Sequence, residues 1–188
     1  MIHVRFAVGM AASILVLTAG LSVSYPAVSA GQRIKASGSK GFDFEFGTWR
    51  VHHRVKSSTG WVEFEGTSRA RPLMDGSANV EDNTFMRPAG VTHGVALRAY
   101  DRASDLWAIW WVDSRDPHGA MDPPVKGRFD DGVGTFYADS MVAGRLTRTR
   151  FIWSKITATS AQWEQALSTD GGKSWDTNWI MEFQRVQQ

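Results

Sequence analysis

The 188-residue sequence contains no cysteine, and this absence excludes several kinds of protein. Without cysteine there is no disulfide framework, no thiol nucleophile and no acceptor for a lipid anchor. Histidine is scarce, at five residues. His52 and His53 are neighbours, and neighbours on a strand point to opposite faces, so they cannot share a metal ion. His118 with Asp116 or Asp122 is a weaker alternative, and we expect no metal site and no cofactor.

The chain also lacks an excess of charge of one sign. It has 21 Lys and Arg against 19 Asp and Glu, a formal net charge of +2. Because nucleic-acid binding needs a concentrated basic surface, this balance argues against a nucleic-acid partner. No Gly-x-Ser-x-Gly elbow and no Gly-x-Gly-x-x-Gly loop is present, so common acyl-transfer and dinucleotide sites are not expected.

The N-terminus is typical of a secretory signal peptide. His3 and Arg5 precede a mostly apolar stretch over 6–23, and the small-residue sequence "VSA" ends at Ala30. We expect cleavage after Ala30 and a periplasmic or secreted protein. The alternative is a retained membrane anchor, since the apolar stretch approaches the length that spans a bilayer. The small residues before the cleavage position favour the signal peptide, and we expect no stable membrane anchor.

The mature chain is expected to be a flexible leader, 31–41, followed by one domain, 42–188. The leader is "GQRIKASGSKG", which is rich in Gly, Ser and Lys. Beyond it, short β-type runs alternate with turn signals, at a spacing of about 8 to 14 residues. This pattern predicts an all-β antiparallel meander of about nine or ten strands.

Two further features refine that fold prediction. The stretch "STDGGKSW", 168–175, matches the Asp-box turn of sialidase propellers, but it occurs once and therefore predicts a hairpin rather than a repeated blade. Nine Trp and ten Phe exceed what a thin two-sheet core needs. We therefore expect the strands to close into an up-and-down barrel that lines a cavity with aromatic rings.

The segment "FEFGTWRV" resembles the opening of lipocalin and other calycin barrels. Gly47, Thr48 and Trp49 form a Gly-x-Trp motif after the apolar "FDFEF", and Arg185 lies in the last expected strand. The resemblance implies a short helical turn at the barrel floor and an arginine stacked across Trp49, where a cation contributes roughly 0.5 to 2 kcal/mol.

A wider likeness, over 42–185, is to a family of bacterial, often exported, calycin-like proteins of unknown function. It rests on "GTWRV", "LMDGSANVED", "LWAIWWVDSR", "PPVKGRF", "TRFIWS", "WEQALSTDGGKSW" and "NWIMEFQR". It implies a lipocalin-like barrel and brings no settled reaction. The haem-binding nitrobindin branch has further glycines after its Gly-x-Trp, and the absence of glycine from 50–56 argues against haem.

Strand alternation selects the candidate site residues. One face of the run "LWAIWWVD" carries an aromatic and apolar stripe that ends in an acid, and neighbouring strands supply polar groups of matching parity. The predicted ligand-binding residues are Asn79, Glu81, Arg98, Trp107, Ile109, Trp111 and Asp113, with Arg150 and Gln165 as further candidates whose register is less certain. Glu81 and Arg98 either meet inside the barrel or form an exposed cross-strand pair. His53 shares parity with Trp49 and is expected to point inward.

Three functions are compatible with these features. The first is an exported barrel that binds a small, largely apolar molecule in a Trp-lined lumen. The alternative is an acid/base enzyme, an isomerase, hydratase or hydrolase, that uses Glu81 or Asp113 with Arg98 or Arg150. A third is an envelope interaction module with an exposed apolar patch in place of a cavity. The oligomeric state is not predicted.

Overall fold

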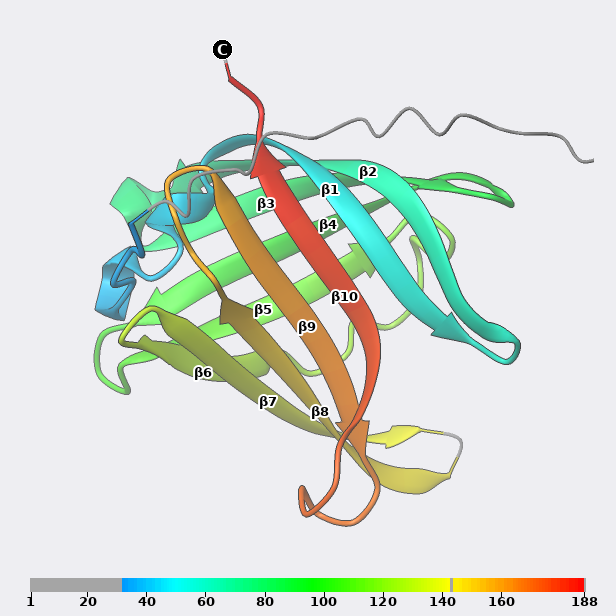
Figure 1. The fold of residues 1–188 in the computed structure, drawn as a ribbon. Helices are drawn as coiled ribbons and strands as arrows, with labels where there is room; N and C mark the ends of the chain where they lie inside the picture. The colour runs from blue at the N-terminus through cyan, green and yellow to red at the C-terminus, as the bar shows by residue number, and fades with distance from the viewer. Residues whose placement is uncertain (1–31, 143, 188) are drawn as a thin grey trace, which may run out of the picture. The chain divides into compact units, whose positions relative to one another are not determined.

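The structure is a computed structural model that describes residues 32–142 and 144–187. These residues form ten antiparallel strands that close into an up-and-down barrel (Figure 1). The strands are β1 (Gly47–Ser57), β2 (Gly60–Leu73), β3 (Ala78–Arg87), β4 (Gly90–Asp101), β5 (Leu106–Asp113), β6 (Val125–Asp130), β7 (Val133–Val142), β8 (Arg145–Ser154), β9 (Ser160–Ser168) and β10 (Asp176–Arg185). Each strand pairs with its neighbours in sequence, and β1 pairs with β10 to close the barrel. The predicted fold class is confirmed.

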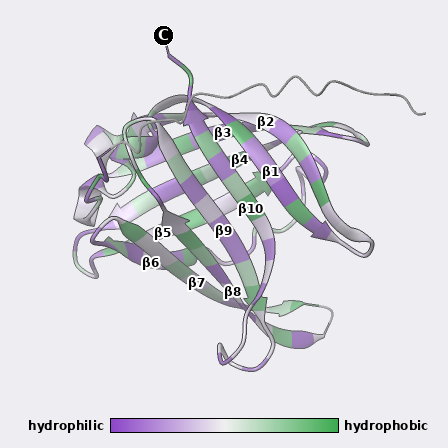
Figure 2. Ribbon diagram, viewed as in Figure 1, coloured by the Kyte–Doolittle hydropathy of each residue, from purple (hydrophilic) through white to green (hydrophobic). Residues whose placement is uncertain are grey.

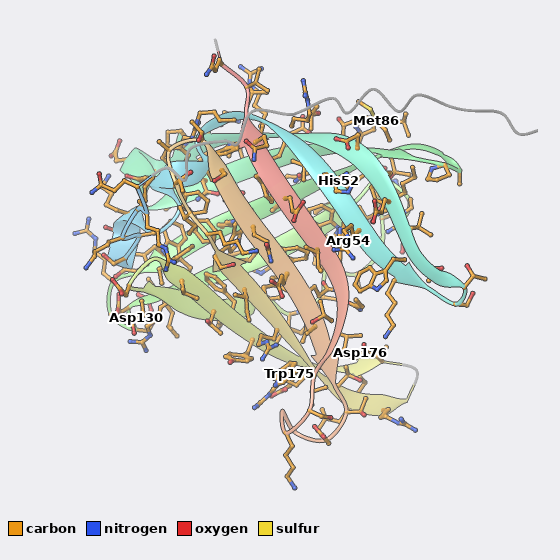
Figure 3. All side chains as sticks on the ribbon, viewed as in Figure 1. His52, Arg54, Met86, Asp130, Trp175 and Asp176 are labelled. Atoms are coloured by element: carbon orange, nitrogen blue, oxygen red, sulfur yellow. The ribbon has the colours of Figure 1, made fainter. Side chains whose placement is uncertain are left out.

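Alternation of side chains determines which face of each strand lies inside. On β2 every second residue from Phe64 to Ala70 is buried, and the residues between them are exposed. Hydrophilic and hydrophobic residues are accordingly interleaved along the strands (Figure 2). On the outer face of β1, His52 and Arg54 pair with acids of β2 (Figure 3). Since a strand has a period of two, this pattern fixes the register with the apolar set inside.

The two ends of the barrel differ in how they are covered. Three short 3-10 helices, η1 (Gly38–Lys40), η2 (Asp43–Glu45) and η3 (Met74–Gly76), accompany the strands. Residues 42–45, which we call the plug, place Phe42 and Phe44 in the aromatic core, where Phe42 is fully buried. We call this the closed end, and the opposite end, where the β1–β2 and β5–β6 connections lie, the open end. The short helical turn predicted at the barrel floor is confirmed.

The predicted stack at the closed end is also confirmed. Trp49 is fully buried, and its indole N–H donates to the Glu45 carbonyl at 2.7 Å. The guanidinium of Arg185 lies 4.1 Å from the Trp49 ring centroid. It donates to the carbonyls of Phe44 at 2.5 Å and Phe46 at 2.6 Å. Arg185 therefore holds the plug against the last strand as well as covering the indole.

Part of the segment expected to be a leader contacts the closed end. The Ile34 amide donates to the Ile156 carbonyl at 2.9 Å, and Ala36 is buried in the core. The Trp107 indole donates to the Gly38 carbonyl at 2.9 Å. The expected signal peptide, 1–30, lies outside the described residues. Among the residues that the structure does describe, no helix is long and apolar enough to cross a membrane.

The Asp-box stretch forms the connection between β9 and β10. Asp170 accepts hydrogen bonds from the amides of Lys173 and Ser174, both at 3.0 Å, and from the hydroxyls of Ser168 and Ser174. Since Asp170 organises the whole turn, the hairpin interpretation of this motif is confirmed.

Candidate functional site: a cavity above the plug

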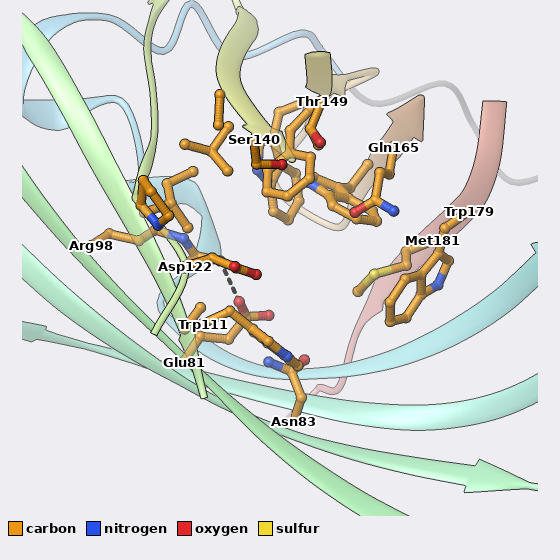
Figure 4. A pocket seen from close by; sticks show the side chains of 18 of the residues that line it. Glu81, Asn83, Arg98, Trp111, Asp122, Ser140, Thr149, Gln165, Trp179 and Met181 are labelled. Atoms are coloured by element: carbon orange, nitrogen blue, oxygen red, sulfur yellow. Dashed lines mark hydrogen bonds and ion pairs between the residues drawn. The ribbon is translucent and has the colours of Figure 1, made fainter. Parts of the chain in front are cut away.

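The barrel encloses a cavity of about 250 Å³ between the plug and the open end (Figure 4). Its wall is mainly apolar and includes six aromatic side chains, Phe85, Trp111, Phe151, Trp153, Trp163 and Trp179. Its polar lining consists of Glu81, Asn83, Arg98, Asp122, Ser140, Thr149 and Gln165. Asp122 and Pro123 belong to the β5–β6 connection, so the cavity extends to the open end.

Four of these aromatic side chains come from three consecutive strands, in which every second residue points inward. Phe151 lies two residues from Trp153 on β8, Trp163 lies on β9, and Trp179 on β10. The ring centroids of Phe151 and Trp163 are 4.8 Å apart, and those of Trp163 and Trp179 are 5.7 Å apart at a near-perpendicular angle. These contacts hold each ring through its neighbour, so the wall is formed without a ligand.

Trp111 covers the opposite side, where β5 passes β4. A Cβ atom on Gly94 would lie only 2.1 Å from the Trp111 ring, so this glycine provides the space in which the indole lies. The ladder between β5 and β6 contains only three residue pairs, from Trp107 to Ile109. Beyond Ile109 the strand is therefore held to the barrel from the β4 side.

The floor of the cavity contains a buried ionic triad. Arg98 is 3% exposed, and its Nη1 donates to Glu45 at 2.5 Å while its Nη2 donates to Glu81. Nη1 also donates to Asn79 at 3.1 Å, and the Ser68 hydroxyl donates to Glu81 at 2.6 Å. The triad lies between the plug and the cavity, because Arg98 is 4.6 Å from the Phe42 ring centroid and also lines the cavity.

The triad contains two acidic side chains and one basic side chain, all of them buried. Burial disfavours the charged form of each. Burial raises the pKa of Glu45 well above its usual range, and the attraction of Arg98 offsets this only in part. Burial alone would lower the pKa of Arg98, but Glu45 and Glu81 together raise it. Arg98 therefore stays charged, and Glu45 keeps its proton more readily than an exposed glutamate does.

Asn83 is a polar residue of the wall with an unsatisfied hydrogen-bond acceptor. It is 2% exposed, it lines the cavity, and its Oδ1 has no donor among the described residues. A buried acceptor without a partner costs about 1 to 3 kcal/mol. The Nε atom of Arg98, a donor, is likewise buried without a hydrogen-bond partner among the described residues.

His53 lies behind this wall and points inward, as predicted. Its ring stacks on Phe64 at 4.8 Å, and the Trp179 indole donates to its Nδ1 at 3.3 Å. Burial, with the charge of Arg87, lowers the pKa of His53 to about 3. A neutral imidazole here accepts the hydrogen bond that orients the cavity-lining Trp179.

Five of the nine predicted site residues line the cavity: Glu81, Arg98, Ile109, Trp111 and Gln165. Glu81 and Arg98 form the internal pair of the two alternatives considered. Gln165 donates to Asn178 at 3.1 Å.

The other four predicted residues do not line the cavity. They either lie below it along the barrel axis or point away from it. Asn79 is fully buried below the cavity, where it accepts a hydrogen bond from Arg98. Trp107 has the inward parity but lies in the closed-end core. Asp113 ends β5 and pairs with Arg115, which lowers the pKa of this carboxyl to about 2. Arg150 lies between the inward residues of β8 and stacks on Trp175 at 4.3 Å.

Several lining residues were absent from the prediction. Phe151, Trp153, Trp163 and Trp179 alternate along their strands and had the same signal that selected Trp111. Asn83 shares the parity of Glu81. Glu45 gives no such signal, because it lies in a short 3-10 turn outside the strands. Within 32–142 and 144–187, no three His, Cys, Asp or Glu side chains are grouped so as to hold a metal ion.

No family profile and no curated protein matches the chain. Solved structures do match. The S-type phycobiliprotein lyase CPES from Guillardia theta is 11% identical, over 78% of this chain and 91% of the lyase, with a TM-score of 0.51. A de novo designed fluorescence-activating β-barrel is 13% identical, over 77% of this chain and 95% of its own, with a TM-score of 0.43. A structure of mFAP2b bound to DFHBI is 12% identical, over 80% of this chain and all of that one (100%), with a TM-score of 0.45.

At these identities the likeness to the lyase shows the fold alone. The chain is similar in fold to this lyase, and its membership of the exported calycin-like family stays a prediction.

Proposed function

We propose that this protein binds a small, largely apolar molecule inside the barrel. The observation that carries the proposal is the open, aromatic-walled cavity above a fully packed floor. The volume of the cavity is about 250 Å³. It lies just below the range of about 300 to 1,000 Å³ usual for drug-sized ligands, which favours a ligand of one or two rings.

The acid/base enzyme has less support from the same geometry. Both oxygens of Glu81 already accept hydrogen bonds, one from Ser68 and one from Arg98. Asp113 is held ionised by Arg115 and does not line the cavity. The arginines expected to assist these acids are not available either, because Arg98 is bound to both glutamates and Arg150 does not line the cavity. An interaction module would not need this cavity.

The proposal is tested with a neutral, polarity-sensitive naphthalene dye. We expect saturable binding of one dye per chain, a blue-shifted emission, and quenching of the Trp fluorescence by energy transfer. Ala138→Phe adds a ring to the cavity wall and should abolish binding, while the far-UV circular dichroism stays unchanged.

Ala99→Phe is the matched control, because Ala99 follows the cavity-lining Arg98 on β4 and has the outward parity. This variant should bind like the wild type. Dye binding that survives Ala138→Phe would place the dye elsewhere and contradict the proposal.

We also propose that the protein functions outside the cytoplasm, in the periplasm or the medium. The support is the sequence of 1–30 alone. N-terminal sequencing of the protein from an exporting host should begin at Gly31, and an intact Met1 in the mature protein would contradict it.

A further inference from the structure

We propose that the floor of this cavity recognises a hydrogen-bond donor on the ligand, the ammonium group of an arylmethylamine above all, and rejects carboxylates. This inference rests on the proposed function and adds the chemical class of the ligand. It is argued from Asn83, Glu81 and the charges around them.

The first step is the unmet demand of Asn83. Its Oδ1 is an acceptor with no donor among the described residues, although the side chain is almost fully buried. Asn83 and Glu81 are two residues apart on β3, and their side chains lie on the same side of the cavity (Figure 4). This oxygen is itself buried, so a ligand N–H or O–H reaches it only when the Asn83 amide turns its oxygen toward the lumen, and the ligand then supplies a bond that nothing else in the described protein does.

The second step is the remaining capacity of Glu81. Each of its oxygens accepts one hydrogen bond, from Ser68 or from Arg98. A carboxylate oxygen has about two lone-pair sites, so each oxygen retains room for a further donor. Glu81 and Asn83 thus present acceptors side by side, which suits an ammonium with three N–H groups.

The third step is the sign of the local charge. The ionisable groups that line the cavity are Glu81, Asp122 and Arg98, and Glu45 contacts Arg98 from below. Both terminal nitrogens of Arg98 donate to the glutamates, and its Nε is buried, so Arg98 presents no exposed donor to a ligand carboxylate. The nearby cation Arg87 stacks on Phe64 at 4.7 Å and does not line the cavity. An anion entering here would therefore meet acceptors and acids without a free cation.

The test uses four naphthalenes of equal ring size that compete with the neutral dye. They are 2-naphthylmethylamine, which is cationic, 2-naphthol, which is a neutral donor, 2-methylnaphthalene, which has no polar group, and 2-naphthoate, which is anionic. We expect affinity to fall in that order, with at least about a tenfold difference between the amine and the naphthoate, as for a hydrogen bond to a charged group.

Two variants locate the preference. Asn83→Leu and Glu81→Gln should each reduce the affinity ratio of amine to 2-methylnaphthalene at least about fivefold, because each removes an acceptor or its charge. Asn83→Leu keeps the side-chain size and removes an unsatisfied group, so the variant should fold. Asp82→Asn is the matched control, since Asp82 lies between them on the exposed face of β3, and it should leave the ratio unchanged.

The outcomes separate the two proposals. If neither the dye nor any naphthalene binds, the proposed function fails and this inference fails with it. If the naphthalenes bind with equal affinity, or the naphthoate binds tightest, the binding function stands and the donor preference is overturned. An amine preference that persists in both variants would overturn the assignment to Glu81 and Asn83.

Discussion

The closed and open halves of this barrel are built from the same residue types but use them differently. In the closed half, Trp49 and Trp107 are at most 1% exposed, and each indole N–H donates to a backbone carbonyl. In the open half, Trp111 is 39% exposed, and Asn83 has no partner among the described residues. The lumen is therefore filled with side chains below the triad and hollow above it.

The plug accounts for this difference. Phe42 packs against Trp107, Phe129 and Phe136 with centroid distances of 4.9 to 5.7 Å, so it fills the lower lumen with rings. No corresponding segment of the described chain enters from the open end. The comparison shows that the filled core and the cavity proposed to bind a ligand are separated along the barrel axis, with Arg98 at the boundary.

The largest expected effect is on the closed half. Trp49→Ala should lower the free energy of unfolding by about 3 to 5 kcal/mol, because it removes a fully buried indole and leaves a cavity. The affinity of the folded variant for the neutral dye should be unchanged. Chemical denaturation and dye titration measure the two effects, and Trp61→Ala, on an exposed indole, is the control. A loss of affinity without a loss of stability would break the separation.

The boundary layer should affect both halves. Arg98→Met leaves Glu45 and Glu81 buried without their cation, and breaking a buried ion pair costs about 3 to 5 kcal/mol. Since Arg98 also lines the cavity, dye affinity should fall in parallel. Arg69→Met, on an exposed residue of β2, is the control for both measurements. A fully stable Arg98→Met variant would show that the triad does not hold the two halves together.

The pH dependence of stability should reveal the lowered pKa of His53. Its pKa is about 3 in the folded protein and 6.5 as the reference for the unfolded chain, so the unfolded state binds the extra proton between these values. Stability should therefore fall as pH decreases from about 6.5 to 3, with a slope approaching about 1.4 kcal/mol per pH unit. Glu45 acts in the opposite sense, since its raised pKa makes stability fall as pH rises above about 4.5.

Because these two slopes oppose each other, the measurement is the difference between the wild type and His53→Gln. The variant keeps an acceptor for Trp179 and removes the titrating ring, so the difference should carry the slope of His53 alone. Equal profiles for wild type and His53→Gln would contradict the assignment.

The sequence predicted well which face of each strand points into the barrel, and poorly how far along the barrel axis an inward residue lies. Ile109 and Trp107 share a parity, yet only Ile109 reaches the cavity, because the level at which the plug ends decides which inward residues are covered. Parity has a period of two and carries no information on that level. The contact of Trp49 with Arg185 was predicted from the resemblance to calycin barrels, and the pairing of β1 with β10 brings the two residues together.

The remaining errors have other physical causes. On β8 the aromatic Phe151 and Trp153 occupy the inward positions. Arg150 therefore points outward, where it stacks on Trp175. Glu45 was missed because its neighbours form one turn of 3-10 helix, and one turn has no periodicity to read. Its partners Arg98 and Glu81 belong to β4 and β3, which only the closed barrel places above the plug.

The smallest expected effect on stability, and the most specific effect on binding, comes from Gly94. In Gly94→Ala the new Cβ would lie 2.1 Å from Trp111, and the obstructing atoms belong to a side chain at the mouth of the cavity. The indole can move away, because β5 has no pairing with β6 beyond Ile109. We expect a cost of about 1 kcal/mol or less to folding and about a tenfold loss of dye affinity.

Gly66→Ala is the informative comparison, since its Cβ would lie 2.5 Å from the Thr84 carbonyl, which is backbone and cannot turn aside. That variant should lose more stability than Gly94→Ala. If Gly94→Ala instead unfolds the protein as readily as Gly66→Ala does, then Trp111 is part of the scaffold, and the boundary between the two halves lies closer to the open end than the triad.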